Sequence, residues 1–241
     1  LVGSEMCIRD RSSSSYVIYD HFVINDFSQL FKVIFLLSAL AVSIISSSYF
    51  KEDEPHQAEY YVLLLSSALG MLITASANDF LTIFVGIELS AFSSYGLVAF
   101  RKTDDKSTEA GAKYLLIGAF SSALTLYGIS LLYALTGSVT FEGVNAFLTG
   151  IDNGVIDGDF NELIFISSLF IIAGLGFKIA VVPFHAWAPD VYEGAPTPVT
   201  ALLAAASKAM GFVALFKVFI FTLEPFSDEW SIVLSLIHIS E

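Results

Sequence analysis

The chain has 241 residues, of which 55% are hydrophobic and only 15% charged, and its formal net charge is −13. Soluble domains carry about 25% charged residues, so this composition excludes an ordinary soluble globule and favours a protein that lies in a lipid bilayer. The excess of acidic residues and the lack of a basic patch exclude a nucleic-acid partner.

The sequences at the two ends of the chain differ in character from the rest. LVGSEMCIRDR at the start and SLIHISE at the end resemble translated sequencing adapters. We therefore expect residues 1–15 and 235–241 to be non-native, and residues 16–234 to be an internal piece of a longer membrane protein. The single cysteine, Cys7, excludes an internal disulfide and a Cys-ligated cluster, and the scattered histidines predict no metal site.

Apolar runs of about 20 residues, the length that crosses a membrane, recur along the chain. Six complete spans are predicted, at residues 29–50, 60–77, 80–100 and 112–135, from about Glu162 onward, and at 197–222. A seventh begins at Trp230. The fold class is therefore all-α, a polytopic membrane helix bundle.

The links between the spans differ in length and charge. Asn78-Asp79 is so short that the second and third spans must form a tight antiparallel hairpin. Residues 136–161 form a long acidic link rich in Gly and Asp. Because basic short loops face the cytoplasm, the link holding Arg101, Lys102 and Lys106 predicts the cytoplasmic side, and the acidic link the opposite side.

The fifth span runs into the proline-rich stretch PFHAWAPDVYEGAPTP. Proline removes a backbone donor and clashes with the preceding turn, so the helix must kink or break at Pro183. Broken backbone at membrane depth requires protein or a hydrated cavity around it. The alternative is that Pro183 ends the span and an exposed loop follows.

Ionisable residues within spans are functional candidates because each is costly to insert. Glu88 lies near the centre of the third span, and Lys178 lies five residues before Pro183. If the two pair, each sets the proton affinity of the other. The alternative for Glu88 is a protonated carboxyl that holds two helices together.

Four further residues belong to this group. Lys208 lies among small residues near the middle of the sixth span, too deep to reach the headgroups. Lys113 begins the fourth span and is either functional or interfacial. His185 is either a proton shuttle or a hydrogen-bonding partner. Lys217 lies nearer the end of its span, and we expect it to snorkel to the surface.

Three stretches resemble a known family: FVGIELSAFSSYGLVAF, STEAGAKYLLIGAFSSALTLYGISLLYALTGS and GFKIAVVPFHAWAPDVYEGAPTPVTALLAAASKAMGF. They resemble the subunit N family of bacterial NADH-quinone oxidoreductase (respiratory complex I), whose mitochondrial counterpart is NADH dehydrogenase subunit 2. The resemblance covers residues 26–221. PDVYEGAPTPVTA followed by SKA is similar to the N type rather than to the sister subunits L and M.

The resemblance implies a membrane subunit of an H⁺-translocating NADH:quinone oxidoreductase that couples quinone reduction to proton translocation. It implies a proton relay formed by Glu88, Lys178, Lys208, Lys113 and His185. It also implies an antiporter-like fold of two inverted five-helix repeats, each with a broken helix. One repeat would begin at Tyr60, and the second would lie outside this chain.

The resemblance further implies that this chain holds no cofactor. Quinone, FMN and iron–sulfur clusters would belong to partner subunits. The partners would be the other membrane subunits of complex I and the lipid bilayer, in the cell inner (plasma) membrane. Three alternatives stay open: a subunit of a multisubunit cation/proton antiporter or membrane-bound hydrogenase, a non-pumping structural subunit, and a retinal-type pump, in which the proline-rich break has no place.

Overall fold

A computed structural model describes residues 16–50, 56–156, 158, 160–227, 230, 231 and 235. The expected leader with Cys7, nearly all of the expected tail with His238, and most of the expected seventh span lie outside the described residues. The predictions made for those segments stay predictions.

Within the described part of the chain, six helical stretches are long and apolar enough to cross a membrane, which confirms the six predicted spans. They are α2 (Asp26–Tyr49), α3 (Gln57–Ser76), α4 (Phe80–Val98), α5 (Asp105–Thr136), α7 (Asn161–Ile179) and a last span at Thr197–Thr222. This last span is not uniformly wound. It consists of α9 (Thr197–Leu202), the π-wound η1 (Leu203–Ser207), α10 (Lys208–Leu215) and the π-wound η2 (Phe216–Thr222).

Short elements lie before, between and after the spans. They are β1 (Tyr16–Ile18), β2 (Phe22–Ile24), α6 (Phe141–Asp152), α8 (Ala188–Gly194) and the 3-10 turn η3 (Glu224–Phe226). The two strands form an antiparallel hairpin in which Tyr16 lies opposite Ile24. The sequence did not predict this hairpin.

Helix α6 occupies the centre of the acidic link predicted at residues 136–161. Phe141, Val144 and Leu148 are buried along one face of α6. Their spacing of three, four and seven residues is that of an amphipathic helix. The Gly and Asp residues around this stripe are typical of loops, so composition did not indicate the helix.

The proline-rich stretch contains both a turn and a helix. α7 ends at Ile179, and Ala180 adopts a left-handed conformation with φ of 61°. Helical structure resumes at α8, in which Ala188 and Val191 are buried. The alternative of a wholly exposed loop was therefore wrong. The assignment of α7 and α8 as two halves of one broken helix stays a prediction.

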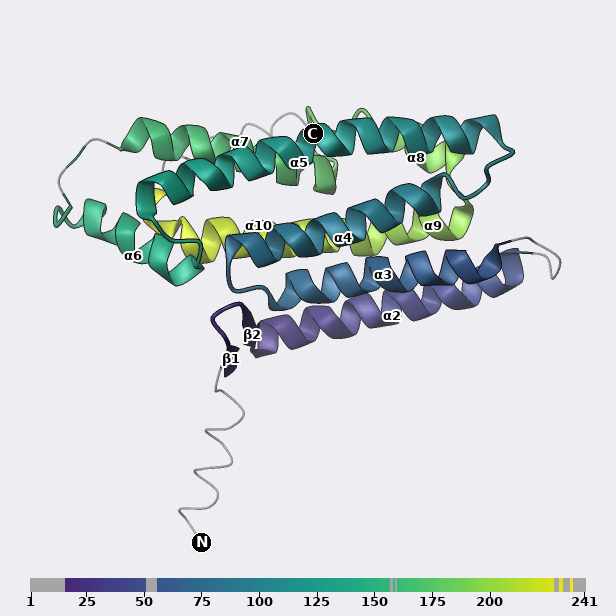
Figure 1. The fold of residues 1–241 in the computed structure, drawn as a ribbon, viewed down its shortest axis with the longest axis horizontal. Helices are drawn as coiled ribbons and strands as arrows, with labels where there is room; N and C mark the ends of the chain where they lie inside the picture. Colours follow the sequence, from purple (N-terminus) through teal and green to yellow (C-terminus); the bar gives the residue numbers. More distant parts are fainter. Residues whose placement is uncertain are drawn as a thin grey trace, which may run out of the picture.

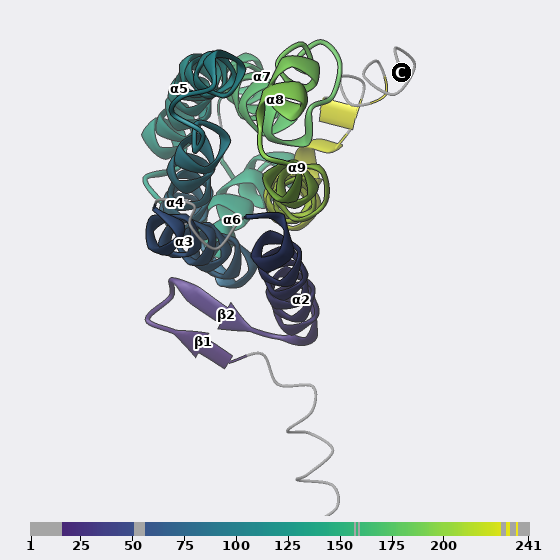
Figure 2. The same cartoon turned by 90° about the vertical axis from the view of Figure 1, so that its right-hand side faces the viewer.

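The spans lie side by side along the long axis of the molecule (Figure 1). The β1–β2 hairpin, α6 and the turn between α3 and α4 lie at one end, while α8 and the link between α4 and α5 lie at the other. Viewed along the bundle, the last span lies between α2 on one side and α7 and α8 on the other (Figure 2). Each end of the bundle therefore has its own polar cluster.

The hairpin of α3 and α4 depends on small residues. A Cβ atom added at Gly70 would lie 2.5 Å from the backbone nitrogen of Ser90 and 2.6 Å from the carbonyl oxygen of Gly86. Asp79 caps the start of α4, where its carboxylate accepts a 2.8 Å hydrogen bond from the Thr82 N–H. The close approach and the cap together fix the tight hairpin that the short link predicted.

Replacing Gly70 by alanine is expected to destabilise the bundle by about 1–3 kcal/mol, because backbone on α4 must move to admit the methyl group. The matched control is Gly96→Ala, where the nearest atom is the flexible end of Leu63 at 3.1 Å. The measurement is the thermal unfolding midpoint of the full-length protein in detergent. Equal midpoints for the two variants would contradict the close packing.

Candidate functional site

Glu88 lies in the middle of α4 and faces α5. Its carboxylate accepts a 2.5 Å hydrogen bond from the Ser122 hydroxyl, which also lies 3.0 Å from the Gly118 carbonyl oxygen. A hydroxyl donates one proton and also accepts. When Glu88 is ionised, Ser122 donates to it. When Glu88 is protonated, it donates to Ser122, and Ser122 donates to Gly118. The serine therefore serves both protonation states of the carboxyl.

Lys178 lies in the last turn of α7, with 5% of its surface exposed. Its ammonium nitrogen is buried, and within the described part of the chain it has no hydrogen-bond partner. Burying a charge without a partner is costly. A structural role alone does not account for a lysine held in this way.

Glu88 and Lys178 line the same small cavity. Its volume is about 10 Å³, about the size needed for one water. Ser121, Thr125 and Gly174 also line it. A Cβ added at Gly174 would collide with the Thr125 hydroxyl, so α5 and α7 approach closely only because residue 174 is glycine. The structure thus brings together the two residues that the sequence analysis paired.

A row of aromatic rings leads away from Lys178. Its ammonium lies 6.0 Å from the centre of the Tyr95 ring, within reach of a cation–π attraction. The Tyr95 ring meets Tyr114 edge to face, with centroids 4.7 Å apart. Tyr114 is stacked on Trp187, again at 4.7 Å. Lys178 therefore has aromatic rings, rather than an acceptor, on this side.

The same row ends at Lys208. Trp187 meets Tyr192 with ring centroids 6.0 Å apart, and the Lys208 ammonium lies 5.8 Å from the Tyr192 ring. The indole N–H of Trp187 donates to the Phe177 carbonyl at 3.1 Å, which ties the row to the end of α7. Burial raises the pKa of Tyr192, so its phenol stays protonated. Both lysines thus contact one row of rings from opposite ends.

Lys113 and His185 do not line the cavity of Glu88 and Lys178. Lys113 is 43% exposed in its side chain and forms ion pairs with Glu109 at 2.8 Å and with Asp190 at 2.6 Å. The pair with Glu109 lies within α5, and the pair with Asp190 joins α5 to α8 at the end of the bundle that carries the link between α4 and α5. His185 is exposed in the connection between α7 and α8.

The expectation that Lys217 snorkels was wrong. It is 4% exposed, and its ammonium donates to the carbonyl oxygens of Ala75 at 2.7 Å and Ala77 at 2.6 Å. Carbonyls at the end of a helix have no intrahelical partner, so the end of α3 offers acceptors inside the bundle. The signal in the sequence was positional, because the last span runs parallel to α3 and brings Lys217, near its end, level with the turn after α3.

The sequence analysis also missed Ser122, Tyr95, Tyr114 and Tyr192. Serine and tyrosine are common in membrane helices, and nothing in the spacing of these residues separates them from ordinary packing positions. Ser122, Tyr95 and Tyr192 are singled out only by their contacts with Glu88 and the two lysines, and Tyr114 by its place between Tyr95 and Trp187. Within the described residues, no group of three His, Cys, Asp or Glu side chains is arranged to hold a metal ion.

The chain is similar to membrane subunits of redox complexes. Residues 77–240 match the family model described as NADH:quinone oxidoreductase/Mrp antiporter, TM. NADH-quinone oxidoreductase subunit N of Desulfitobacterium hafniense is 44% identical over 218 residues, covering 86% of this chain and 42% of that protein. F(420)H(2) dehydrogenase subunit N of Methanosarcina mazei is 41% identical over 228 residues, covering 94% of this chain and 45% of that protein.

A solved structure has the same fold. A chain of respiratory complex I from Thermus thermophilus with bound aureothin superposes with a TM-score of 0.70 and 31% identity, over 88% of this chain and 44% of that chain. The present chain therefore spans less than half the length of each of these relatives.

Replacing Lys178 by methionine is expected to stabilise the folded protein by about 1–3 kcal/mol, because it removes a buried polar group without a partner and keeps the volume of the side chain. Lys208→Met is the matched control, since Lys208 is only partly buried. The thermal unfolding midpoint of the full-length protein in detergent measures the effect. A lower midpoint for Lys178→Met than for the unchanged protein would contradict this account of Lys178.

Proposed function

The chain belongs to the family of membrane subunits shared by NADH:quinone oxidoreductases and Mrp antiporters, and on that premise we propose that it carries protons in the membrane arm of an NADH:quinone oxidoreductase. The observation that carries the proposal is the cavity shared by Glu88 and Lys178. A carboxyl and an amine inside one bundle can exchange a proton without contact with bulk water.

The coupling in this proposal is electrostatic. When Glu88 is ionised, it favours the charged form of Lys178 across the cavity, and when it is protonated that support is lost. Ser122 accommodates both states of the carboxyl by reversing its hydrogen bond. A change elsewhere in the complex that protonates or deprotonates Glu88 would therefore change the proton affinity of Lys178.

Lys208 is the next proton-carrying residue in the proposed path. The aromatic row between the two lysines includes three phenol groups, which both accept and donate hydrogen bonds. Water beside these phenols would complete the path. Lys113 and His185 are included on the resemblance alone. Lys113, with its two acidic partners, would act at the end of the bundle marked by Arg101 and Lys102.

The redox chemistry belongs to partner subunits in this proposal. Quinone, FMN and iron–sulfur clusters would reside there, and this chain would contact other membrane subunits in the inner (plasma) membrane. The Methanosarcina relative is named for a different electron donor. This name favours a second candidate function: the same proton path in a complex that oxidises an electron donor other than NADH. The residues proposed to carry protons do not bind the electron donor, so they fit either complex.

The direct test uses membrane vesicles that carry the complete complex. Glu88→Gln, Lys178→Met and Lys208→Met are each expected to lower proton pumping by about tenfold or more, while the complex still assembles. Pumping is measured as acidification of the vesicle interior during NADH oxidation. The controls are Glu59→Gln and Lys102→Met, both at exposed positions. Normal pumping by the three variants would leave only a structural role for the chain.

A double-mutant cycle tests the pairing of Glu88 with Lys178. Residues that act as a unit give non-additive effects, so the double variant Glu88→Gln/Lys178→Met is expected to pump no worse than the poorer single variant. The cycle is measured in the same vesicles, at equal amounts of assembled complex. Losses that multiply would mean that the two residues act independently.

A further inference from the structure

The turn between α3 and α4, Ala77 to Asp79, contacts segments that are distant in the sequence. The Asn78 N–H donates to the His21 carbonyl at 2.8 Å, which brings in the β1–β2 hairpin. The Phe80 N–H donates to the Val139 carbonyl at 3.0 Å, which brings in the segment before α6. The turn is therefore held from two sides by backbone hydrogen bonds.

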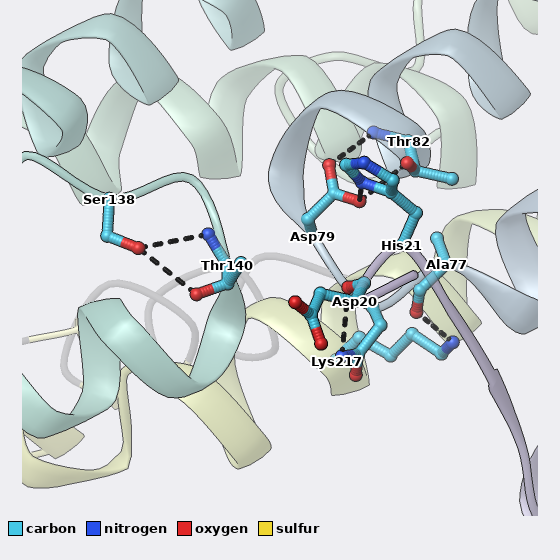
Figure 3. Close-up of polar contacts among 9 residues, drawn as sticks. Asp20, His21, Ala77, Asp79, Thr82, Ser138, Thr140 and Lys217 are labelled. Carbon is cyan, nitrogen blue, oxygen red and sulfur yellow. Dashed lines mark hydrogen bonds and ion pairs between the residues drawn. The ribbon is translucent and has the colours of Figure 1, made fainter. Parts of the chain in front are cut away.

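Asp79 fixes the turn from within. Its carboxylate is 1% exposed and accepts from the Thr82 N–H at 2.8 Å and the Thr82 hydroxyl at 2.5 Å. It also lies 3.0 Å from the Nδ1 atom of His21. Figure 3 shows these side chains beside Lys217. Lys217 binds backbone carbonyls, that of Ala75 in α3 and that of Ala77 in the turn.

Lys217 joins the last span to this fixed turn. Its ammonium donates to the Ala75 and Ala77 carbonyls, at the negative end of the α3 dipole. Hydrogen bonds from an ionised donor are about twice as strong as neutral ones. Within the described residues Lys217 has no carboxylate within ion-pair distance, so these carbonyls are the acceptors that hold its charge.

The segment that carries Lys217 has a second attachment. The Thr222 hydroxyl donates to the Lys217 carbonyl at 2.9 Å, and the Asn145 amide of α6 donates to the Thr222 carbonyl at 3.0 Å. The π-wound η2 is thus tied both to α3 and to α6. π-helical turns are rare and occur mostly as single-turn bulges inside α-helices, frequently at functional sites.

We propose that Lys217 is a positioning residue: by holding the end of the last span on the carbonyls of α3, it sets the depth of Lys208 in the bundle. Lys208 lies nine residues earlier on the same continuous span, about 14 Å along the axis. The proposal rests on the proposed function, because it gives Lys208 a place in the proton path. Slippage of the span by one helical turn would move Lys208 by about 5.4 Å relative to Tyr192.

The test compares Lys217→Met with Lys217→Arg in vesicles that carry the complete complex. Methionine cannot donate to the two carbonyls, and we expect it to lower the protons pumped per electron pair by about threefold or more, while NADH oxidation continues. Arginine still donates to both, and we expect it to restore at least half of the normal ratio. Lys102→Met, at an exposed position at the other end of the bundle, is the control and should pump normally.

The outcomes separate this inference from the proposed function. If Lys208→Met pumps normally, the proposed function fails. If Lys208→Met stops pumping while Lys217→Met pumps normally, only the positioning role of Lys217 is overturned. An assembled Lys217→Arg complex that pumps no better than Lys217→Met also overturns it. Should Lys217→Met not assemble, Lys217→Gln replaces it, because its amide is neutral and its side chain is one bond shorter, and it is expected to pump less than Lys217→Arg.

Discussion

The structure depends on one constraint, that a polar group inside a membrane bundle must find its partner within the bundle. Lys217 satisfies this constraint, because its ammonium donates to two backbone carbonyls at the end of α3. Lys178 does not, because its buried ammonium has no hydrogen-bond partner in the described residues. This contrast supports the two proposed roles, anchoring for Lys217 and proton transfer for Lys178.

Small side chains make this arrangement compatible with close packing. Gly70 lets α3 approach the backbone of α4, and Gly174 lets α7 approach α5. Serine and threonine then supply hydroxyls where the helices meet, as Ser122 does for Glu88. The space that remains between Glu88 and Lys178 is about the size of one water. Tight packing therefore limits the hydration of the pair and strengthens the electrostatic influence of one on the other.

The two ends of the bundle are built differently. One end carries exposed ion pairs that join Lys106 and Lys113 of α5 to α8, and salt screens such contacts. The other end carries the buried contacts of Lys217 and Asp79, which solvent reaches poorly. An exposed end is suited to exchange protons with the aqueous phase, and a buried end is suited to hold helices in place. The aromatic row from Tyr95 to Tyr192 lies between the two proposed proton carriers.

The sequence by itself determined the fold class, the six spans and the ionisable residues within them, because hydrophobic runs and the cost of buried charge act within single segments. It did not determine α6, whose apolar stripe lies among acidic residues, or the burial of Lys217. Only the tertiary structure decided that Glu88 and Lys178 share a cavity and that aromatic rings join Lys178 to Lys208. Those contacts join different helices, so they depend on how the helices pack and rotate, which no periodicity along one chain segment specifies.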